Sequence, residues 1–299
     1  MNVLSLFDGI SCGMVALERA GIKVDKYYAS EIDKYAMQIS KKNYPDIIQL
    51  GDITKWKEWD IDWVNIDLII GGSPCQGFSF SGKMLNFEDP RSKLFFVFVD
   101  IVNHTKQLNP NVKFLLENVR MKQEWQDVIN KHLGVKPVLI NSSLFSAQTR
   151  NRLYWANWDV PNPIEDKGIV WSNVMLHNAT DVYYLSPKML DWVNKTEERK
   201  KKFKIYTAES DCKMQMIEAS HYKGISNQRC FAILDNARLR YIHPIECERL
   251  QTLPDNYTKG VSNTQRYKMI GNGWTVDVIA YILSFITKQN DLNKEGDEE

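Results

Sequence analysis

The sequence predicts an α/β fold: a mostly parallel sheet with helices on both faces, followed by a smaller irregular lobe. Three observations indicate this. Short apolar runs alternate with helix-like segments in the first half of the chain, turns with glycine or acidic residues follow those runs, and the alternation fades after about Trp158. Strands that alternate with helices form parallel sheets covered on both sides, because the crossover helices lie on the faces of the sheet.

The expected elements follow in chain order. Expected strands cover 3–7, 26–30, 47–50, 66–70 and 112–116, and expected helices cover 11–20, a segment after Asp33 and a segment around 92–102. Each strand is a short apolar run that ends in turn residues. Two more helices are expected at 244–251 and 275–286. The last one is apolar on more than one face, so we expect it to be buried against the first sheet.

The segment between about residues 158 and 237 has no clean hydrophobic period, and it contains several prolines and the basic run 199–204. Prolines and irregular composition favour loops over long regular elements. We therefore expect a catalytic domain made of 1–159 and 262–290, a lobe at 160–261 and a disordered acidic tail at 291–299.

Composition is that of an ordinary globular protein, with 43% hydrophobic and 25% charged residues among 299. The net charge of +1 does not by itself indicate a nucleic-acid-binding protein. We expect no membrane span and no leader, since strand-like sequence begins almost at once. The cysteines lack metal-ligand spacing, which favours a reducing compartment without disulfides or a metal site. Four of them, Cys12, Cys212, Cys230 and Cys247, are expected to be small buried apolar residues.

The fifth cysteine lies in a distinctive loop. Cys75 follows Gly71-Gly72-Ser73-Pro74, directly after the apolar run 66–70. Such a loop lifts a residue out of the carboxyl edge of the sheet, where open α/β sheets bind ligands. A thiol at this place is a candidate nucleophile.

Three strand ends carry residues suited to a nucleoside-bearing cofactor. The turn 6–13 holds glycines that allow close approach of a ligand to the main chain. Glu31 ends the second strand and could accept ribose hydroxyls, and Asp52 ends the third and could accept an adenine amino group. Each acid alone could equally be a helix cap. Together they favour such a cofactor, and without a GxGxxG turn NAD is not the first choice.

Further polar residues are expected near the cysteine. Glu117 ends an apolar strand, so it should lie beside Cys75 and could donate a proton or a strong hydrogen bond. Arg150 and Arg152 share one face if their segment is extended, and could stabilise a thiolate, a carbonyl oxygen or a phosphate. A surface salt-bridge stripe is the alternative for the two arginines.

Together these motifs resemble the DNA (cytosine-5)-methyltransferases, in that family's order over nearly the whole chain. The matching segments are Phe7-Asp8-Gly9, Glu31, Gly51-Asp52-Ile53, Pro74-Cys75-Gln76, Glu117-Asn118-Val119, Arg150-Asn151-Arg152, 244–251 and 271–276. Ser11-Cys12-Gly13 and Gly273-Trp274 look like the animal de novo enzymes. Met1 directly before the first strand suits a stand-alone bacterial or bacteriophage member.

The resemblance implies a Rossmann-like S-adenosylmethionine-dependent methyltransferase sheet with a target-recognition lobe. It implies S-adenosylmethionine as cofactor, double-stranded DNA as substrate, a possible cognate restriction endonuclease and a place in the cytoplasm of a bacterial host. The cofactor-binding positions that it implies are Phe7, Asp8, Gly9, Glu31, Ile32, Asp52, Ile53, Pro74, Leu94, Asn272 and Trp274. For Leu94, a plain core leucine is an equal alternative.

The resemblance also implies a mechanism. The thiolate of Cys75 adds to C6 of cytosine, so that C5 can accept a methyl group. Arg152 is the leading activator of the thiolate, with Arg150 nearby, and Glu117 holds the N3 and amino edge of the base. The base must be flipped out of the duplex, and the loop 76–90 has the composition of a lid.

Recognition of the DNA sequence is expected in the lobe. The candidate DNA-contacting residues are Gln76, Ser79 and Lys83 in the loop, and Arg199, Lys200, Lys201 and Arg229 in the lobe. The segment His221-Tyr222-Lys223-Gly224 is a further candidate. For any one of these, a solvated loop or helix end without base contacts remains the alternative.

Two other functions stay open. One subgroup of this family methylates tRNA, but it usually replaces the residue after the cysteine, so Gln76 favours DNA. A catalytically silent DNA-binding protein is the other alternative, although Cys75, Glu117 and both arginines are present. The motif of amino-methyltransferases does not occur in the sequence.

Overall fold

The computed structural model describes residues 1–74, 90–163, 165–227 and 229–295. The chain divides into two compact units. The first unit comprises Met1–Asn141, Asn151–Ile164 and Val276–Glu299, and the second unit comprises Ser142–Arg150 and Glu165–Thr275. The segments 142–150 and 262–275, which the sequence analysis assigned to the same domain as the sheet, group here with the second unit.

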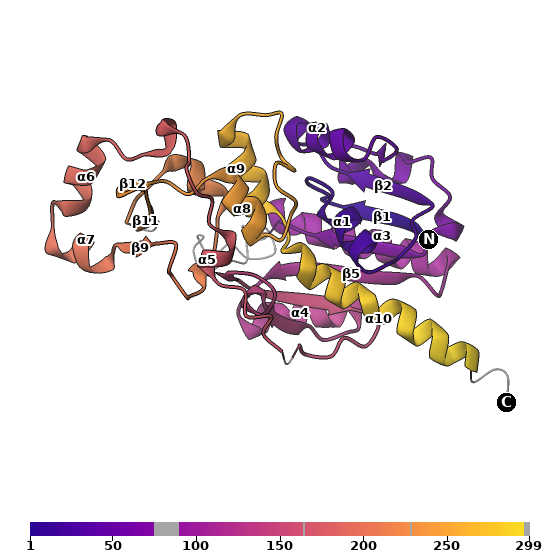
Figure 1. Ribbon diagram of the computed structural model, residues 1–299. Coiled ribbons are helices and arrows are strands. Elements are labelled where there is room, and N and C mark those ends of the chain that lie inside the picture. The colour runs from indigo at the N-terminus through magenta and orange to yellow at the C-terminus, as the bar shows by residue number, and fades with distance from the viewer. Residues whose placement is uncertain (75–89, 164, 228, 296–299) are drawn as a thin grey trace. The chain divides into compact units, whose positions relative to one another are not determined.

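The first unit contains a seven-stranded sheet in the order β3-β2-β1-β4-β5-β8-β6. Figure 1 labels β1, β2 and β5 of this sheet. The strands are β1 Asn2–Leu6, β2 Lys26–Ser30, β3 Ile48–Gln49, β4 Leu68–Gly72, β5 Lys113–Val119, β6 Val138–Asn141 and β8 Asn151–Ala156. The neighbouring pairs from β3 to β5 are parallel, whereas β8 is antiparallel to both β5 and β6. The expected mostly parallel sheet is therefore confirmed.

Helices connect these strands. They are α1 Cys12–Arg19, α2 Lys34–Asn43, α3 Pro90–Leu108, α4 Gln123–Leu133 and α10 Val276–Glu295, with 3₁₀ turns η1 Ile53–Glu58 and η2 Trp63–Asn65. Consecutive residues of β4 and β5, including Ile69, Ile70, Phe114 and Leu115, are all fully buried. Because successive side chains of a strand point to opposite faces, both faces of the sheet are covered.

Close packing at the sheet explains one glycine of the loop motif. A Cβ atom on Gly71 would lie 2.9 Å from the carbonyl oxygen of Leu6 and 3.0 Å from a ring carbon of Phe98. Gly71 ends the strand pairing between β4 and β1. The absence of a side chain there lets β4 lie close to β1 and to α3 just before the loop that carries the cysteine.

The last helix was expected to be buried, and it is. Val278, Ile279, Ile282 and Leu283 of α10 are fully buried, and α10 packs against α1. Contrary to the sequence analysis, the stretch Asn263–Ile286 is long and apolar enough to cross a membrane by length and composition. Within an 18-residue window of this stretch, 56% is buried inside the protein, and core helices pass the same test of length and composition, so this stretch is weak evidence for a span.

The second unit, which includes the expected irregular lobe, contains more regular structure than the sequence suggested. Its three-stranded sheet has the order β12-β11-β9, and a short pair joins β7 to β10. Its strands are β7 Gln148–Thr149, β9 Lys204–Tyr206, β10 Met214–Gln215, β11 Phe231–Asp235 and β12 Arg238–Arg240. Its helices are α5 Trp171–Val174, α6 Pro187–Asn194, α7 Glu197–Lys202, α8 Pro244–Leu250 and α9 Asn263–Asn272, with 3₁₀ turns η3 Ser142–Leu144, η4 Asp181–Tyr183 and η5 Ala219–Lys223.

Helix α9 was missed because its first residues are polar and show no apolar period. Yet Arg266 in that helix is buried, and its Nη2 donates to Oε1 of Glu248 at 2.9 Å. A second buried cation, Arg240, donates to Glu246 through both Nη atoms and to Asp235 through Nε. Ion pairs of this kind hold the second unit together at positions where the sequence pattern predicts solvent-exposed side chains.

Candidate active site

The turn after β1 is held in an unusual backbone conformation. Phe7, Gly9 and Ser11 all have positive φ, at 59°, 62° and 59°. Glycine tolerates this region, but a bulky residue such as Phe7 adopts it only where the surroundings enforce it. Strained backbone of this kind concentrates at functional sites, so the turn is a candidate ligand-binding element.

Asp8 anchors this turn from inside. Its Oδ1 accepts a hydrogen bond from the Tyr27 hydroxyl at 2.7 Å, and its Oδ2 accepts one from Ser11 at 2.6 Å. Burial raises the pKa of Asp8, and these hydrogen bonds oppose that rise. The side chain of Asp8 is therefore committed to holding the turn.

Glu31 follows β2 and ties the same turn to the next strand. Its Oε2 accepts from the N–H of Gly9 at 2.8 Å, and its Oε1 accepts from the N–H groups of Ile32 and Asp33 at 2.7 and 2.8 Å. Ile32 beside it is 76% exposed. An exposed apolar side chain next to a fixed carboxylate fits an adenosine group, with the base on the apolar surface and the ribose hydroxyls near the acid.

Asp52 and Ile53 follow β3. The Oδ1 of Asp52 accepts from the N–H and the hydroxyl of Thr54, both at 2.9 Å, and these bonds lower the pKa of Asp52. Asp52 thus also caps η1, which is the alternative role that the sequence left open. Ile53 is only 5% exposed and belongs to the core cluster, so its side chain is not available to a cofactor.

Two other expected cofactor positions belong to the first unit. Pro74 is half-buried at the start of the loop. Leu94, on α3, packs against the core cluster, in agreement with its alternative reading as a core leucine. Cys75, Gln76, Ser79 and Lys83 lie outside the described residues.

The ends of β4, β5 and β8 bring the expected polar residues together. Gly72, the last residue of β4, is paired with Glu117 of β5. The Nε of Arg152 lies 2.9 Å from Oε1 of Glu117, and the two side chains are 10% and 12% exposed. Glu117 and Arg152 thus form a nearly buried ion pair beside the strand that leads to Cys75.

Asn118 fixes the start of the cysteine loop. Its Nδ2 donates to Oγ of Ser73 at 3.1 Å, and Ser73 and Asn118 are 4% and 2% exposed. The Glu-Asn-Val motif therefore provides an acid at one position and an anchor for the loop at the next.

Arg150 belongs to the second unit and has different partners. Its Nη1 donates to the carbonyl of Ile217 at 3.2 Å, and its Nη2 donates to those of Gly271 and Gly273 at 3.3 and 3.1 Å. Arg150 is 4% exposed. These contacts support the main chain of the turn 271–273, so we infer a positioning role for Arg150 in place of the expected catalytic one.

Sequence reasoning missed a polar cluster around the same turn. Nε2 of Gln251 donates to the carbonyls of Ile270 and Gly273 at 2.9 and 3.0 Å, and its Oε1 accepts from Gln148 and Thr275. Gln148 and Gln251 are fully buried. In the sequence, only their position could have indicated a role: Gln148 lies just before Arg150-Asn151-Arg152, and Gln251 ends the matching segment 244–251.

The two expected cofactor residues of this turn are available. Asn272 is exposed and Trp274 is half-buried. Both belong to the second unit, where the cluster of Gln251 and Arg150 holds the main chain on either side of Asn272.

Most basic side chains of α7 contact residues of the same helix or of the neighbouring helix α6. Lys200 pairs with Glu197 at 2.7 Å, and Lys202 pairs with Glu198 at 2.6 Å. The Arg199 guanidinium stacks over the Trp192 ring at 4.2 Å. Lys201 is exposed. This arrangement matches the alternative of a solvated helix more closely than a row of free phosphate ligands, although exposed ion pairs are weak and open readily.

Arg229, a candidate DNA contact, is 8% exposed; its Nε donates to the carbonyl of Gly224 and its Nη1 to Oγ of Ser220. One expectation about a single residue, the burial of Cys212, was wrong. Cys212 is exposed, whereas Cys12, Cys230 and Cys247 are buried as expected. Cys212 lies in an irregular segment between β9 and β10, whose exposure a sequence pattern does not report.

With this geometry established, comparison with known proteins identifies the family. Residues 1–159 and 164–288 match the family of C-5 cytosine-specific DNA methylases. The chain is 31% identical over 307 residues to the type II methyltransferase M1.ScrFI of Lactococcus lactis subsp. cremoris, covering 93% of this chain and 76% of that protein. The chain belongs to the C-5 cytosine-specific DNA methylase family.

Other proteins similar to this methyltransferase are methyltransferases as well. The type II methyltransferase M.HhaI of Haemophilus parahaemolyticus is 27% identical, covering 94% of this chain and 93% of that protein. Among solved structures, the Entamoeba histolytica methyltransferase EhMeth matches with a TM-score of 0.76 at 17% identity, covering 97% and 98% of the two chains. A variant of Spodoptera frugiperda DNMT2 matches with a TM-score of 0.72 at 21% identity, covering 94% and 98%. These structures share the fold.

Membership of the family establishes the type of reaction and the cofactor. The protein is a cytosine-5 methyltransferase that uses S-adenosylmethionine. The first-unit residues fit that cofactor, because Glu31 and the exposed Ile32 adjoin the strained turn at Phe7 and Gly9.

Proposed function

We propose that this methyltransferase modifies carbon 5 of cytosine in double-stranded DNA, through a covalent bond between Cys75 and C6 of a base flipped out of the duplex. The observation that supports this most is the Glu117–Arg152 ion pair beside Gly72. It supplies an acid and a guanidinium where the strand leads into the Pro-Cys-Gln loop.

The cysteine is needed because C5 of cytosine is a poor nucleophile. In the proposed reaction the thiolate of Cys75 bonds to C6, and the electron pair of the C5–C6 double bond moves to C5. When bound, S-adenosylmethionine would supply the methyl group, which bonds to C5 as its bond to sulfur breaks and S-adenosylhomocysteine is left. Loss of the C5 proton to water then lets the C6–S bond break, which restores the double bond and the thiolate.

Glu117 and Arg152 have separate roles in this proposal. Glu117 holds N3 and the exocyclic amino group of cytosine, which stabilises the adduct as N3 gains a proton. Arg152 orients Glu117 through their 2.9 Å ion pair and favours ionisation of a nearby thiol, since a positive neighbour lowers the pKa of a cysteine.

For the cofactor, we propose that Phe7, Gly9, Glu31 and Ile32 hold its nucleoside and amino acid parts. The rigid turn at Phe7 presents main-chain groups, and Ile32 presents an apolar surface to adenine. Asp52 contributes an acceptor at the next strand end. Asn272 and Trp274 are also proposed as cofactor contacts, from their place in the motif 271–276.

DNA is favoured over RNA as substrate because the bacterial relatives are type II methyltransferases. Base flipping is required by the chemistry, since C5 and C6 of a stacked base cannot be reached by a protein thiol. A cognate restriction endonuclease is proposed from the same relatives. An origin of this protein in a bacterium or in a bacteriophage fits these relatives equally.

The test is expression in a host without cytosine methylation, beside a Cys75→Ala variant, followed by mapping of 5-methylcytosine at base resolution. We expect methylation at one short DNA motif with the natural chain and none with Cys75→Ala. Soluble protein without DNA methylation would refute the proposal and favour an RNA substrate or a silent binding protein.

The covalent step has its own test. A duplex with 5-fluorocytosine at the mapped site cannot lose a proton from C5, so the bond between Cys75 and C6 should persist after methyl transfer. We expect a denaturation-resistant protein–DNA complex of the summed mass. Its absence with active enzyme would rule out the covalent route.

A further inference from the structure

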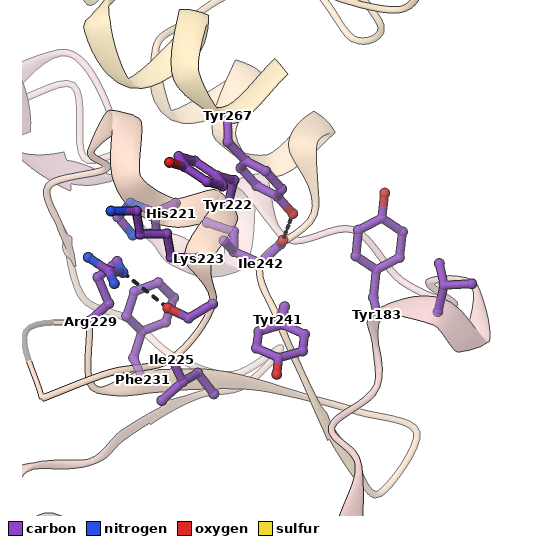
Figure 2. Close-up of a pocket in the computed structure, with 12 residues that line it drawn as sticks. Tyr183, His221, Tyr222, Lys223, Ile225, Arg229, Phe231, Tyr241, Ile242 and Tyr267 are labelled. Carbon is purple, nitrogen blue, oxygen red and sulfur yellow. Dashed lines mark hydrogen bonds between the residues drawn. The ribbon is translucent and has the colours of Figure 1, made fainter. Parts of the chain in front are cut away.

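The second unit contains a cavity of about 330 Å³, which lies within the range of about 300–1,000 Å³ typical of small-molecule sites. Figure 2 shows it between η5, β11 and the segment that leads into α8. Five of the residues that line it are aromatic: Tyr183, Tyr222, Phe231, Tyr241 and Tyr267. Neither the Glu117–Arg152 pair nor the strained turn belongs to this unit.

Arg229 places a buried positive charge at this cavity. Its guanidinium is fixed by bonds from Nε to the Gly224 carbonyl at 3.0 Å and from Nη1 to Oγ of Ser220 at 2.9 Å. In the part of the chain that the structure describes, no carboxylate forms an ion pair with Arg229. Because burying an unpaired charge is costly, a fixed arginine of this kind favours an anionic partner from outside the protein.

His221 adds a buried ring nitrogen with no partner. Its Nδ1 lies 2.8 Å from the main-chain nitrogen and 2.9 Å from the carbonyl oxygen of Glu218, so Nδ1 is occupied and Nε2 is the nitrogen left over. Burial lowers the pKa of His221, so the ring is neutral near pH 7. His221 is 8% exposed, and its Nε2 is buried without a hydrogen-bond partner among the described residues.

The two polar groups lie on one side of the cavity, together with Lys223, and aromatic rings complete the wall (Figure 2). Tyr222 is 38% exposed, and the ammonium groups of Lys223 and Lys268 lie 5.8 and 5.5 Å from its ring centre. The hydroxyl of Tyr267 is bound to the carbonyl of Ile242, so this ring is held in place. The cavity thus combines flat apolar walls, one unpartnered ring nitrogen and fixed positive charge.

A nucleotide has the matching chemistry. Its base is flat and carries hydrogen-bond acceptors, and its phosphate is an anion. Unstacked bases are bound in this way by aromatic side chains and cations in proteins that hold single strands. A simple inorganic anion would leave the aromatic walls unused, and an uncharged ring would leave Arg229 without a partner.

We propose that this cavity binds an unstacked base of the DNA substrate, other than the target cytosine, together with its adjacent phosphate. The base stacks against Tyr222 or Tyr241, Nε2 of His221 forms a hydrogen bond with the edge of the base, and Arg229 and Lys223 bind the phosphate. This proposal rests on the proposed DNA-methylating function. It replaces the expected surface contacts of 221–224 and Arg229 with a recessed site.

Photo-crosslinking tests the placement. The full chain is bound to duplex DNA that carries the mapped methylation site, with 5-iodouracil replacing thymine at each position in turn. We expect irradiation to link the DNA to Tyr222 or Tyr241 from one or two adjacent positions only. Crosslinks confined to other peptides, with DNA bound, would overturn the proposal.

Affinity measurements supply a second test. We expect Tyr222→Ala to weaken DNA binding about tenfold, since stacking on an aromatic side chain contributes about 1–3 kcal/mol per base. Tyr184→Ala is the matched control, because Tyr184 stacks on Arg238 and does not line the cavity. Equal DNA affinity for Tyr222→Ala, Arg229→Gln and the wild type, with all three folded, would also overturn it.

Two further arms separate the possible failures. Methylation of the same duplex is measured for the wild type and for Tyr222→Ala. If the proposed function is wrong, the wild type does not methylate the duplex. If only the cavity proposal is wrong, both proteins methylate it equally. Calorimetric titration with the nucleoside monophosphates tests a free ligand. A monophosphate bound by the wild type but not by Tyr222→Ala, with DNA affinity unchanged, would overturn the DNA strand as the source.

Discussion

Arg152 and Glu117 form an ion pair across two antiparallel strands, with Nε of the arginine 2.9 Å from Oε1 of the glutamate. The pair is formed by the ladder register: Val119 of β5 is the direct partner of Arg152, and the long arginine side chain reaches the level of Glu117. Glu117 is in turn paired with Gly72 on its other side. The adjacent strands β4, β5 and β8 therefore carry, side by side, the start of the cysteine loop, Glu117 and Arg152.

Glu117→Gln should lower kcat by about 10²–10⁴-fold, because the amide cannot supply or accept the proton that N3 requires. The amide has the same shape but leaves the nearly buried Arg152 without its counter-ion, so Tm should also fall and kcat is compared at a temperature where both proteins are folded. Single-turnover methylation of the mapped duplex measures the effect. Glu124→Gln, at an exposed residue paired with Lys122, is the control and should leave kcat unchanged. Wild-type kcat in Glu117→Gln would remove Glu117 from the chemistry.

Arg150→Met should affect stability and cofactor binding more than the chemical step. Removing the guanidinium takes a donor from three carbonyls; that of Gly273 keeps its bond from Gln251, whereas those of Ile217 and Gly271 lose theirs, at a cost of about 1–3 kcal/mol for each unsatisfied group. We expect a lower Tm and a raised KM for S-adenosylmethionine. Unchanged Tm and KM with a collapse of kcat would instead assign Arg150 to the reaction.

Arg240→Met should destabilise the protein by about 3–5 kcal/mol, because it leaves the buried carboxylates of Asp235 and Glu246 without their cation. Arg238→Met is the matched control two residues away. Arg238 pairs with Asp181 at the surface, with 58% and 89% of the two side chains exposed, so its loss should cost less than about 1 kcal/mol. Urea unfolding of both variants measures the difference, and equal losses would contradict it.

Stability should fall on acidification partly through His243. Burial, aided by the charges of Arg266 and Arg240, lowers the pKa of His243 from 6.5 to about 4. Below about pH 6.5 the unfolded chain takes up a proton that the folded protein does not. The contribution to stability is therefore complete above pH 6.5 and is lost as the pH falls toward 4.

His243→Asn tests this directly. Asn is a good residue at the start of a helix, and its side-chain oxygen can replace Nδ1 as acceptor for the N–H of Ile245. We expect the variant to have a flatter dependence of unfolding free energy on pH between 6.5 and 4. Part of the slope should remain, because the pKa of His221 is also lowered by burial. Superimposable pH profiles would exclude His243 as a contributor.

The sequence alone supports the prediction of the sheet, of the elements around the cofactor turn and of the acid at the end of β5. Those features depend on local patterns: an apolar run forms a buried strand, and the turn residues after it mark the sheet edge where a site forms. Glu31 and Glu117 could therefore be selected as site candidates before any contact was known. Ile53 could not be placed correctly, because a residue beside a site motif can equally point into the core.

Tertiary contacts determined the rest. Arg150 contacts Gly271, which is 121 residues away in the chain, and Arg266 pairs with Glu248, 18 residues away. Neither contact follows from a period of 2 or 3.6 residues, since such periods report only which face of one element is apolar. The role of Arg150, the Arg266–Glu248 pair and the aromatic cavity arise from segments that meet only in the folded chain, and Arg150 can be buried because carbonyls of distant residues accept its hydrogen bonds.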